Sequence, residues 1–260
     1  MTKLFWSISI IASVSLFGCT SNNVTIDDNL QQVFNQYQAK GTFALYDNAA
    51  GTFTVHNFNT YKDSSFAPAA TFNIIAALVG IETGRIVNEK MLVPNQPAPI
   101  TVNDAFQTQS LQAFQTINTA IGKDTLQQWL DSLAYGSKKI TTTVDSFWFD
   151  RSLTIKPDEQ LGLIKKLYFS QLPFQKRSQD IVKKMMLRQS NAAYKLSYIT
   201  ASTEHNLQNQ EWNIGFIEEN QHVYFFVLQV ASAKNTPNNS LALSIVQHIL
   251  KSYGFFEGKK

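Results

Sequence analysis

The last third of the sequence contains five consecutive apolar residues, 224–228, in which hydrophobic and polar side chains do not alternate. A run of this kind is typical of a strand that is covered on both faces. Residues 194–200 and 212–218 have the composition of further strands, and residues 241–253 have the period of a helix. This part of the chain therefore predicts a sheet with helices packed on its faces.

The earlier part of the chain fits the same architecture. Residues 30–38 suit a first helix, and residues 41–47 and 52–58 alternate as an antiparallel hairpin. A helix is expected over residues 70–82, because Pro68 lies just before it and Gly84 follows it.

These elements together predict an α+β fold in which an antiparallel sheet is flanked by helices. The chain has 260 residues, of which 44% are hydrophobic and 16% charged, which is ordinary globular composition. The folded domain should cover residues 30–260. Residues 30–66 and 190–260 form its sheet region, and residues 67–189 form a mainly helical region.

The N-terminus has the features of an export signal. A lysine precedes the apolar run 4–17, which is too short for a transmembrane helix and is typical of a secretory signal. The run ends before Cys19, the only cysteine, in a context that resembles a bacterial lipobox. We expect residues 1–18 to be a lipoprotein signal peptide, Cys19 to be lipidated, and residues 19–29 to be a tether. An ordinary signal peptide with a chance cysteine is the alternative.

Charge and histidine content exclude several classes of function. The formal net charge is +3, and no run of lysine or arginine exceeds two residues, so no nucleic-acid-binding surface is expected. The four histidines show no paired spacing typical of a metal site, and we expect no metal and no cofactor. They are His56, His205, His222 and His248.

Residues 66–74, Phe-Ala-Pro-Ala-Ala-Thr-Phe-Asn-Ile, carry a more specific signal. They resemble the start of the active-site helix of the class D (oxacillinase-type) serine β-lactamases, whose pattern is Pro-Ala-Ser-Thr-Phe-Lys. Residues three apart on a helix share a face, so a serine and a lysine at this spacing can exchange a proton. The resemblance implies a β-lactamase or penicillin-binding-protein transpeptidase fold. In this chain, however, the nucleophile position is Ala70 and the position of the lysine base is Asn73.

The resemblance extends over the rest of the chain, so the other family motifs can be placed. The Ser-x-Val motif falls on Gln109, Ser110 and Leu111, which puts glutamine at the relay serine. If a helix continued here, Ser110 would point about 100° away from that position. The Tyr-Gly-Asn motif falls on Tyr135 and its two successors, and Trp148 matches the tryptophan that braces the family's base.

The strand motif Lys-Thr-Gly falls on Ile199, Thr200 and Ala201, so its lysine and its glycine are both replaced. The arginine that binds the β-lactam carboxylate in the family corresponds to Ala242. The expected pocket residues are therefore Thr71, Ser110, Leu111, Tyr135, Trp148, Thr200, Ala201 and Ala242.

Five catalytic or binding positions are thus replaced together. An engineered knock-out would need only one substitution, so the pattern indicates a natural loss of the catalytic groups. The sequence predicts a catalytically inactive protein that binds or organises an envelope partner from a lipid anchor at Cys19, facing the periplasm from the outer membrane. Acylation by β-lactams is not expected. The alternative is a weak β-lactam hydrolase or acyl-transfer enzyme that uses a relocated nucleophile such as Thr71 or Ser110.

Overall fold

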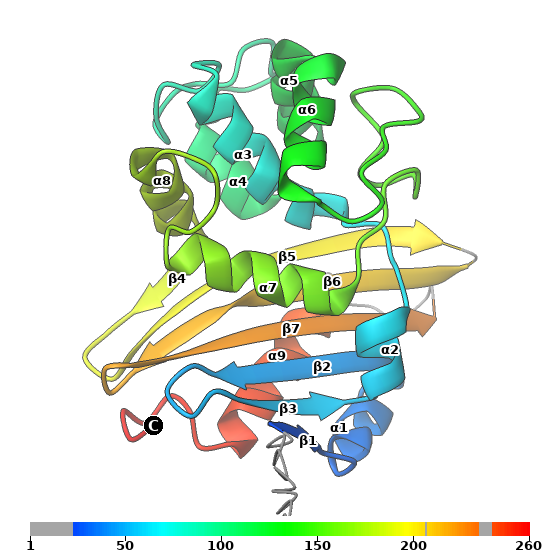
Figure 1. Cartoon of the computed structure of the whole chain (residues 1–260), viewed down its shortest axis with the longest axis vertical. Coiled ribbons are helices and arrows are strands. Elements are labelled where there is room, and N and C mark those ends of the chain that lie inside the picture. Colours follow the sequence, from blue (N-terminus) through cyan, green and yellow to red (C-terminus); the bar gives the residue numbers. More distant parts are fainter. Residues whose placement is uncertain (1–22, 206, 234–240) are drawn as a thin grey trace, which may run out of the picture.

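The computed structural model describes residues 23–205, 207–233 and 241–260. Its centre is a seven-stranded sheet with the strand order β1-β3-β2-β7-β6-β5-β4 (Figure 1). The strands are β1 (Val24–Ile26), β2 (Ala39–Asp47), β3 (Thr52–His56), β4 (Leu187–Ser190), β5 (Tyr194–His205), β6 (Gln208–Glu219) and β7 (His222–Ala233). All neighbouring pairs are antiparallel except β1 with β3, which is parallel.

Helices cover the sheet on both faces (Figure 1). They are α1 (Leu30–Gln36), α2 (Phe58–Asp63), the short 3-10 helix η1 (Ala69–Phe72), α3 (Asn73–Glu82), α4 (Val102–Thr108), α5 (Leu111–Ile121), α6 (Lys123–Leu133), α7 (Pro157–Tyr168), α8 (Lys176–Met186) and α9 (Leu241–Ser252). Helix α7 crosses the front of the sheet in Figure 1, α9 lies behind it, and α3 to α6 and α8 form a group beyond the β5 side. The predicted α+β fold is confirmed, with a mixed rather than wholly antiparallel sheet.

The centre of the sheet is the strand that the sequence marked most clearly. Strand β7 pairs with β2 on one side and with β6 on the other. Its residues Phe225 and Phe226 are both 0% exposed, the first in the core that includes the helical insert and the second in the core that includes α9. The absence of alternation in residues 224–228 therefore reflects burial on both faces, as predicted.

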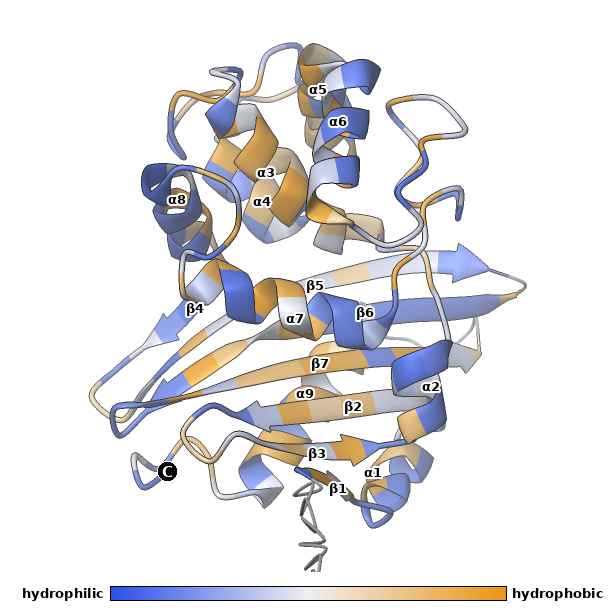
Figure 2. Cartoon of the chain, viewed as in Figure 1, coloured by the Kyte–Doolittle hydropathy of each residue, from blue (hydrophilic) through white to orange (hydrophobic). Residues whose placement is uncertain are grey.

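Helix α3 anchors the helical insert to the sheet. Its residues from Asn73 to Ile81 are all buried, and Figure 2 shows the helix as almost wholly hydrophobic. A helix that is apolar on every side belongs inside a protein, where packing rather than amphipathicity positions it. The insert therefore surrounds α3, and η1 leads directly into it from the sheet side.

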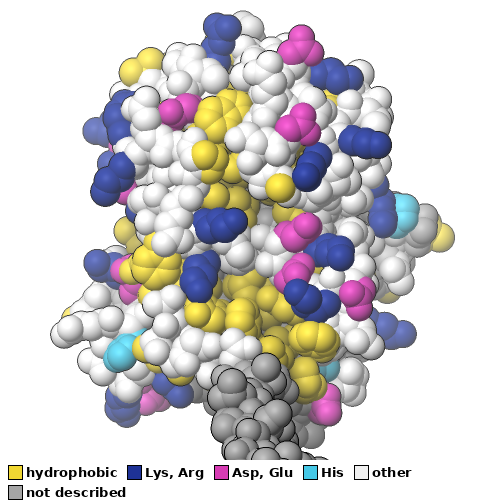
Figure 3. Space-filling model, viewed as in Figure 1, with side chains coloured by type: hydrophobic (Ala, Val, Ile, Leu, Met, Phe, Trp, Pro, Cys, Tyr) yellow, Lys and Arg dark blue, Asp and Glu magenta, His cyan; other side chains and the backbone are white. Residues whose placement is uncertain are grey.

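Helix α2 packs on one end of the front face of β2 and β3, and side chains cover the rest of it. Figure 3 shows hydrophobic side chains along the middle of this face, with lysines and arginines around them. The rings of Tyr46 and Phe53 pack with centroids 4.5 Å apart, and Lys165 Nζ of α7 lies 4.0 Å from the centre of the Tyr46 ring. This cation–π contact lets the aliphatic part of the lysine cover apolar surface.

The structure differs from the sequence prediction at several short elements. Residues 24–26, which were expected in the tether, form strand β1 against β3. Strand β4 begins at Leu187, inside the region expected to be helical, and η1 replaces the first turn of the helix predicted over 70–82. Elements of three or four residues are too short for a periodic pattern to reveal them. The proposed signal peptide and Cys19 lie outside the described residues.

Among the described residues, no helix has the length and apolarity needed to cross a bilayer. The same part of the chain contains no cluster of three or more histidine, cysteine, aspartate or glutamate side chains that could hold a metal ion.

Candidate functional site

Some of the family motif positions, those in η1 and at the junction of α4 with α5, lie beside the outer edge of β5. Strand β4 pairs with β5 only as far as Ser197, so residues 198–205 have a sheet neighbour, β6, on one side only in the described structure. The Arg188 side chain covers the beginning of this edge, because its Nε donates to Tyr198 O at 3.2 Å and its Nη1 donates to Gln107 O at 3.1 Å. Beyond it, the strand edge faces η1 and the junction of α4 with α5.

The backbone before the nucleophile position adopts an unusual conformation. Ala69 has φ +47°, a left-handed value that is costly for a residue with a Cβ. Its N–H donates to Trp148 O at 2.8 Å, which helps to hold the turn in place. Ala70 is half-buried, whereas Asn73, one turn along the chain, is 1% exposed. The strained turn of this motif is therefore present, although a methyl group occupies the nucleophile position.

Thr71 is held in a buried hydrogen-bond chain. Its Oγ1 donates to Pro68 O at 2.6 Å and accepts a hydrogen bond from Gln160 Nε2 at 2.7 Å. Both Thr71 and Gln160 are 0% exposed, so the hydroxyl joins the start of η1 to helix α7.

The aromatic positions of the motifs pack around η1 rather than beside one cavity. Tyr135 and Trp148 both pack against Phe72, with ring centroids 5.9 Å away in each case. Burial raises the pKa of Tyr135, so its hydroxyl stays protonated. Tyr135 lines a cavity of about 230 Å³ with Glu159 and Lys166 of α7. These aromatic residues therefore support the turn more than they form a binding surface.

Gln109 and Ser110 do not lie within a helix, in contrast to the helical placement considered from the sequence. Gln109 ends α4 with φ +57°, and Ser110 caps the start of α5 by accepting a hydrogen bond from Ala113 N at 3.3 Å. Gln109 Nε2 donates to Thr200 Oγ1 at 2.5 Å, and this hydrogen bond links the helical insert to β5. Leu111, the next residue along, is 48% exposed.

Two of the strand-motif residues belong to the core. Ile199 and Ala201 are buried on the sheet face that the helical insert covers, with exposures of 0% and 2%. Trp212 lies opposite Ala201 on β6, and its Nε1 donates to Ala67 O at 2.9 Å. This bond ties the sheet to the segment that leads into η1.

The structure does not bring Ala242 to the β5 edge. Ala242 is 1% exposed and packs in the core between the sheet and α9. Its N–H donates to a carboxylate oxygen of Glu211 at 3.0 Å, so this glutamate caps the beginning of α9. Burial raises the pKa of Glu211. The role of Glu211 was not visible in the sequence, because Glu218 and Glu219 flank the other end of residues 212–217 and nothing in the pattern distinguishes Glu211 from them.

The chemistry available at this site is limited by the partners of its hydroxyl groups. Thr71, Ser110 and Thr200 hydrogen-bond to main-chain or amide groups, and within the described structure no charged side chain bonds to any of them. Asn73 Oδ1 is buried without a hydrogen-bond partner in the same part of the chain. A hydroxyl needs an adjacent base to act as a nucleophile at neutral pH. The arrangement therefore offers hydrogen bonds and a strand edge, and none of these three hydroxyls bonds to a charged base in the described structure.

Comparison with known proteins identifies the family to which this fold belongs. The family model described as the penicillin binding protein transpeptidase domain matches residues 33–251. The probable β-lactamase YbxI of Bacillus subtilis (strain 168) is 30% identical over 82% of this chain and 81% of its own. The β-lactamase OXA-11 of Pseudomonas aeruginosa is 27% identical over 98% of this chain and 100% of its own.

A solved structure extends the likeness to a receptor. The C-terminal domain of the BlaR penicillin-receptor of Bacillus licheniformis is 26% identical, with a TM-score of 0.82 over 91% of this chain and 98% of that domain. The regulatory protein BlaR1 of the same organism is 27% identical over 90% of this chain, which corresponds to 40% of BlaR1. On the family match and these relatives, the chain belongs to the penicillin-binding protein transpeptidase family and is a relative of the class D β-lactamases.

Proposed function

We propose that this protein is a catalytically inactive member of the family that binds a ligand or partner at the outer edge of β5. The proposal rests on the hydrogen-bond partners of the hydroxyl groups at the site. Thr71, Ser110 and Thr200 all bond to main-chain or amide groups, and Ala70 offers no hydroxyl at all. Removing a nucleophile or its base typically lowers turnover by about a millionfold.

The binding role is supported by what the site retains. The strained Ala69 turn and the Trp212 to Ala67 hydrogen bond keep the segment before α3 fixed against the sheet. Main-chain groups on the free side of β5 can pair with an extended segment, because an unpaired strand edge is a ready template for another strand. The BlaR relative is named a penicillin-receptor, which is consistent with binding rather than turnover.

We also propose that the protein acts in the bacterial cell envelope, anchored through a lipid on Cys19. The lipobox-like context of this single cysteine motivates the proposal. Metabolic labelling with an alkyne fatty acid should mark the full chain and leave a Cys19→Ser variant unlabelled. Equal labelling of both, or no labelling of either, would contradict the anchor without affecting the proposed loss of catalysis.

Incubation with a fluorescent penicillin, followed by intact-protein mass spectrometry, tests the loss of catalysis. We expect no covalent adduct and no nitrocefin hydrolysis above the buffer rate at micromolar protein. A stable adduct would favour the second candidate, a weak β-lactam hydrolase or acyl-transfer enzyme. A Ser110→Ala variant would then show whether the half-buried Ser110 hydroxyl is the nucleophile.

A variant that restores the family's serine and lysine tests the loss of catalysis from the other side, by asking whether acylation returns. The double substitution Ala70→Ser with Asn73→Lys should give slow acylation, because the apolar surroundings of position 73 lower a lysine pKa and leave part of it neutral as a base. Each single substitution should give none, since such groups act as a unit. Failure of the double variant, if it remains folded, would show that the isoleucine at the strand-lysine position, Ile199, limits the chemistry more than the missing pair.

A further inference from the structure

A second cavity, of about 440 Å³, lies away from the family site at the other end of β5. Its floor is formed by the side chains of Ser197 on β5 and Phe216 on β6, which are paired residues of neighbouring strands. Its walls are Tyr168 at the end of α7, Leu187 at the start of β4 and Lys183 of α8. The volume lies within the range of small-molecule sites in proteins.

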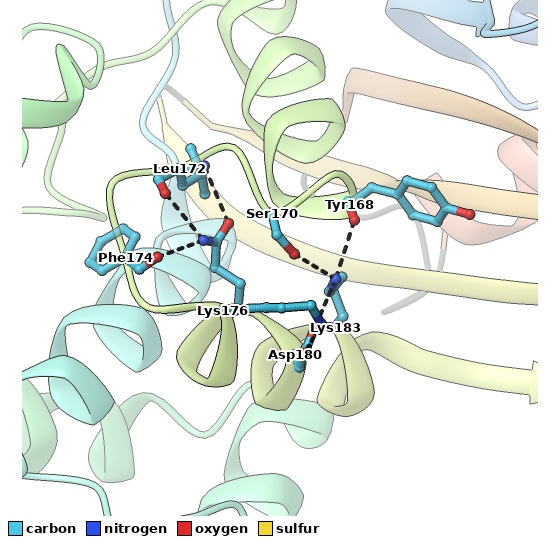
Figure 4. A network of polar contacts seen from close by, with 8 residues as sticks. Tyr168, Ser170, Leu172, Phe174, Lys176, Asp180 and Lys183 are labelled. Carbon is cyan, nitrogen blue, oxygen red and sulfur yellow. Dashed lines mark hydrogen bonds and ion pairs between the residues drawn. The ribbon is translucent and has the colours of Figure 1, made fainter.

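One wall of this cavity is a lysine that is already held in position. Lys183 Nζ contacts Tyr168 O at 3.2 Å, Ser170 Oγ at 3.1 Å and Asp180 Oδ1 at 2.9 Å (Figure 4). These three acceptors use the three hydrogens of the ammonium group and fix the end of α7 against α8. Lys183 therefore shapes the cavity and adds positive potential, but it has no free hydrogen for a ligand.

The free polar groups of the cavity lie on β5. Lys195 and Ser197 are two residues apart, so their side chains point to the same face of the strand. Within the described structure, Lys195 forms no ion pair and the Ser197 hydroxyl makes no hydrogen bond, although Ser197 is only 3% exposed. An ammonium group and a hydroxyl side by side offer two donors, which suits the two oxygens of a carboxylate.

The other residues that line the cavity favour a ligand whose carboxylate is attached to an apolar group. Phe216 and Tyr168 pack edge to face with ring centroids 4.9 Å apart, and Leu187 is 38% exposed at the wall. The one acidic group in the lining, Glu218, already accepts a hydrogen bond from Tyr168 Oη at 2.9 Å. Two of the three lysines in the lining are also engaged, Lys183 with Asp180 and Lys184 with Glu89, so Lys195 is the lysine left to meet a ligand in the described structure.

We propose that this cavity is a binding site for a small aromatic or branched carboxylate. Lys195 and Ser197 bind its carboxylate, and its apolar part lies against Phe216 and Leu187. The site uses none of the residues at the family motif positions. It is therefore independent of the function proposed for the outer edge of β5.

Calorimetric titration of the full chain with 2-naphthoate tests the proposal, with neutral 2-naphthamide as the matched probe. We expect one naphthoate site. A Lys195→Gln variant should bind naphthoate about tenfold more weakly, because a hydrogen bond to a charged group is lost, while its affinity for the amide stays within about twofold. Lys40→Gln, which changes an exposed strand lysine elsewhere, should alter neither affinity.

A cavity-filling variant separates the apolar part of the site from its charge. Leu187→Trp should weaken both probes together, and the partial exposure of Leu187 means that the larger ring need not disturb the core. Naphthoate binding that is unchanged in both the Lys195 and the Leu187 variants would overturn the proposal. Equal loss of naphthoate and naphthamide binding in Lys195→Gln would also overturn it, because the carboxylate would then not be what the site recognises.

Discussion

The buried hydroxyl of Thr71 should stabilise the turn beneath the family site, and a Thr71→Val substitution measures how much. Valine keeps the shape of threonine and the N–H that bonds to Pro68 O at 3.1 Å, but it leaves the buried Gln160 Nε2 without an acceptor. A buried polar group that loses its partner costs about 1–3 kcal/mol, so the free energy of unfolding should fall by about 2 kcal/mol. For a domain of this size that corresponds to a decrease in Tm of about 4–8 °C.

Urea unfolding followed by circular dichroism gives this difference directly. The matched control is Thr108→Val, because the Thr108 hydroxyl bonds to Asp104 O at 2.7 Å on an exposed part of α4 and should change stability by less than about 0.5 kcal/mol. Gln160 Oε1 already lacks a partner, so adding Gln160→Leu to the Thr71 variant should recover part of the loss. A Thr71 variant within about 0.5 kcal/mol of wild type would refute the account of this network.

Three further changes test other parts of the fold. Gly136 has φ +51°, and a Cβ there would lie 2.0 Å from Thr154 O, so Gly136→Ala should lower the free energy of unfolding in urea by about 3 kcal/mol or more. Gly41→Ala would place a Cβ 2.1 Å from a carbonyl oxygen of β7 and should reduce the yield of folded protein, measured by size-exclusion chromatography. Burial raises the pKa of Glu211 in the folded protein. The stabilisation by the protonated Glu211 carboxyl is therefore complete below the pKa of the unfolded chain, about 4.3, and is lost as the pH rises through the folded pKa. A Glu211→Gln side chain can still accept the hydrogen bond from Ala242 N, so the Tm of this variant relative to wild type should rise as the pH increases from 4 to 7. A Tm difference that does not change with pH would contradict the assignment.

The sequence revealed the parts of the fold whose patterns are long. The apolar run 224–228 predicted a central strand, and the apolar residues of 70–82 predicted the buried helix α3. Strand β1 was missed because its three residues owe their conformation to pairing with β3 rather than to a local pattern. Tertiary pairing of this kind cannot be read from a short segment alone.

Motif spacing also described the site only in part. It identified Ala70 as the nucleophile position, but it could not show that Gln109 reaches across to Thr200 or that the Ser110 hydroxyl caps α5. Those side-chain roles depend on the left-handed conformation at Gln109, which separates two helices where one had been considered. Ala242 and its partner Glu211 likewise became linked only through the packing of α9 on the sheet.

Strand β1 also relates the candidate site to the proposed membrane anchor. It begins at Val24, and five residues of extended chain span at most about 18 Å, so an anchor at Cys19 would keep β1 close to the bilayer surface. The strand order places β5 five strands away from β1, a distance of about 24 Å at the usual spacing. With the anchor proposed above, β1 is the strand nearest the attachment point, and β5 lies toward the opposite side of the sheet. A partner at the edge of β5 would therefore meet the protein on the side away from its anchor.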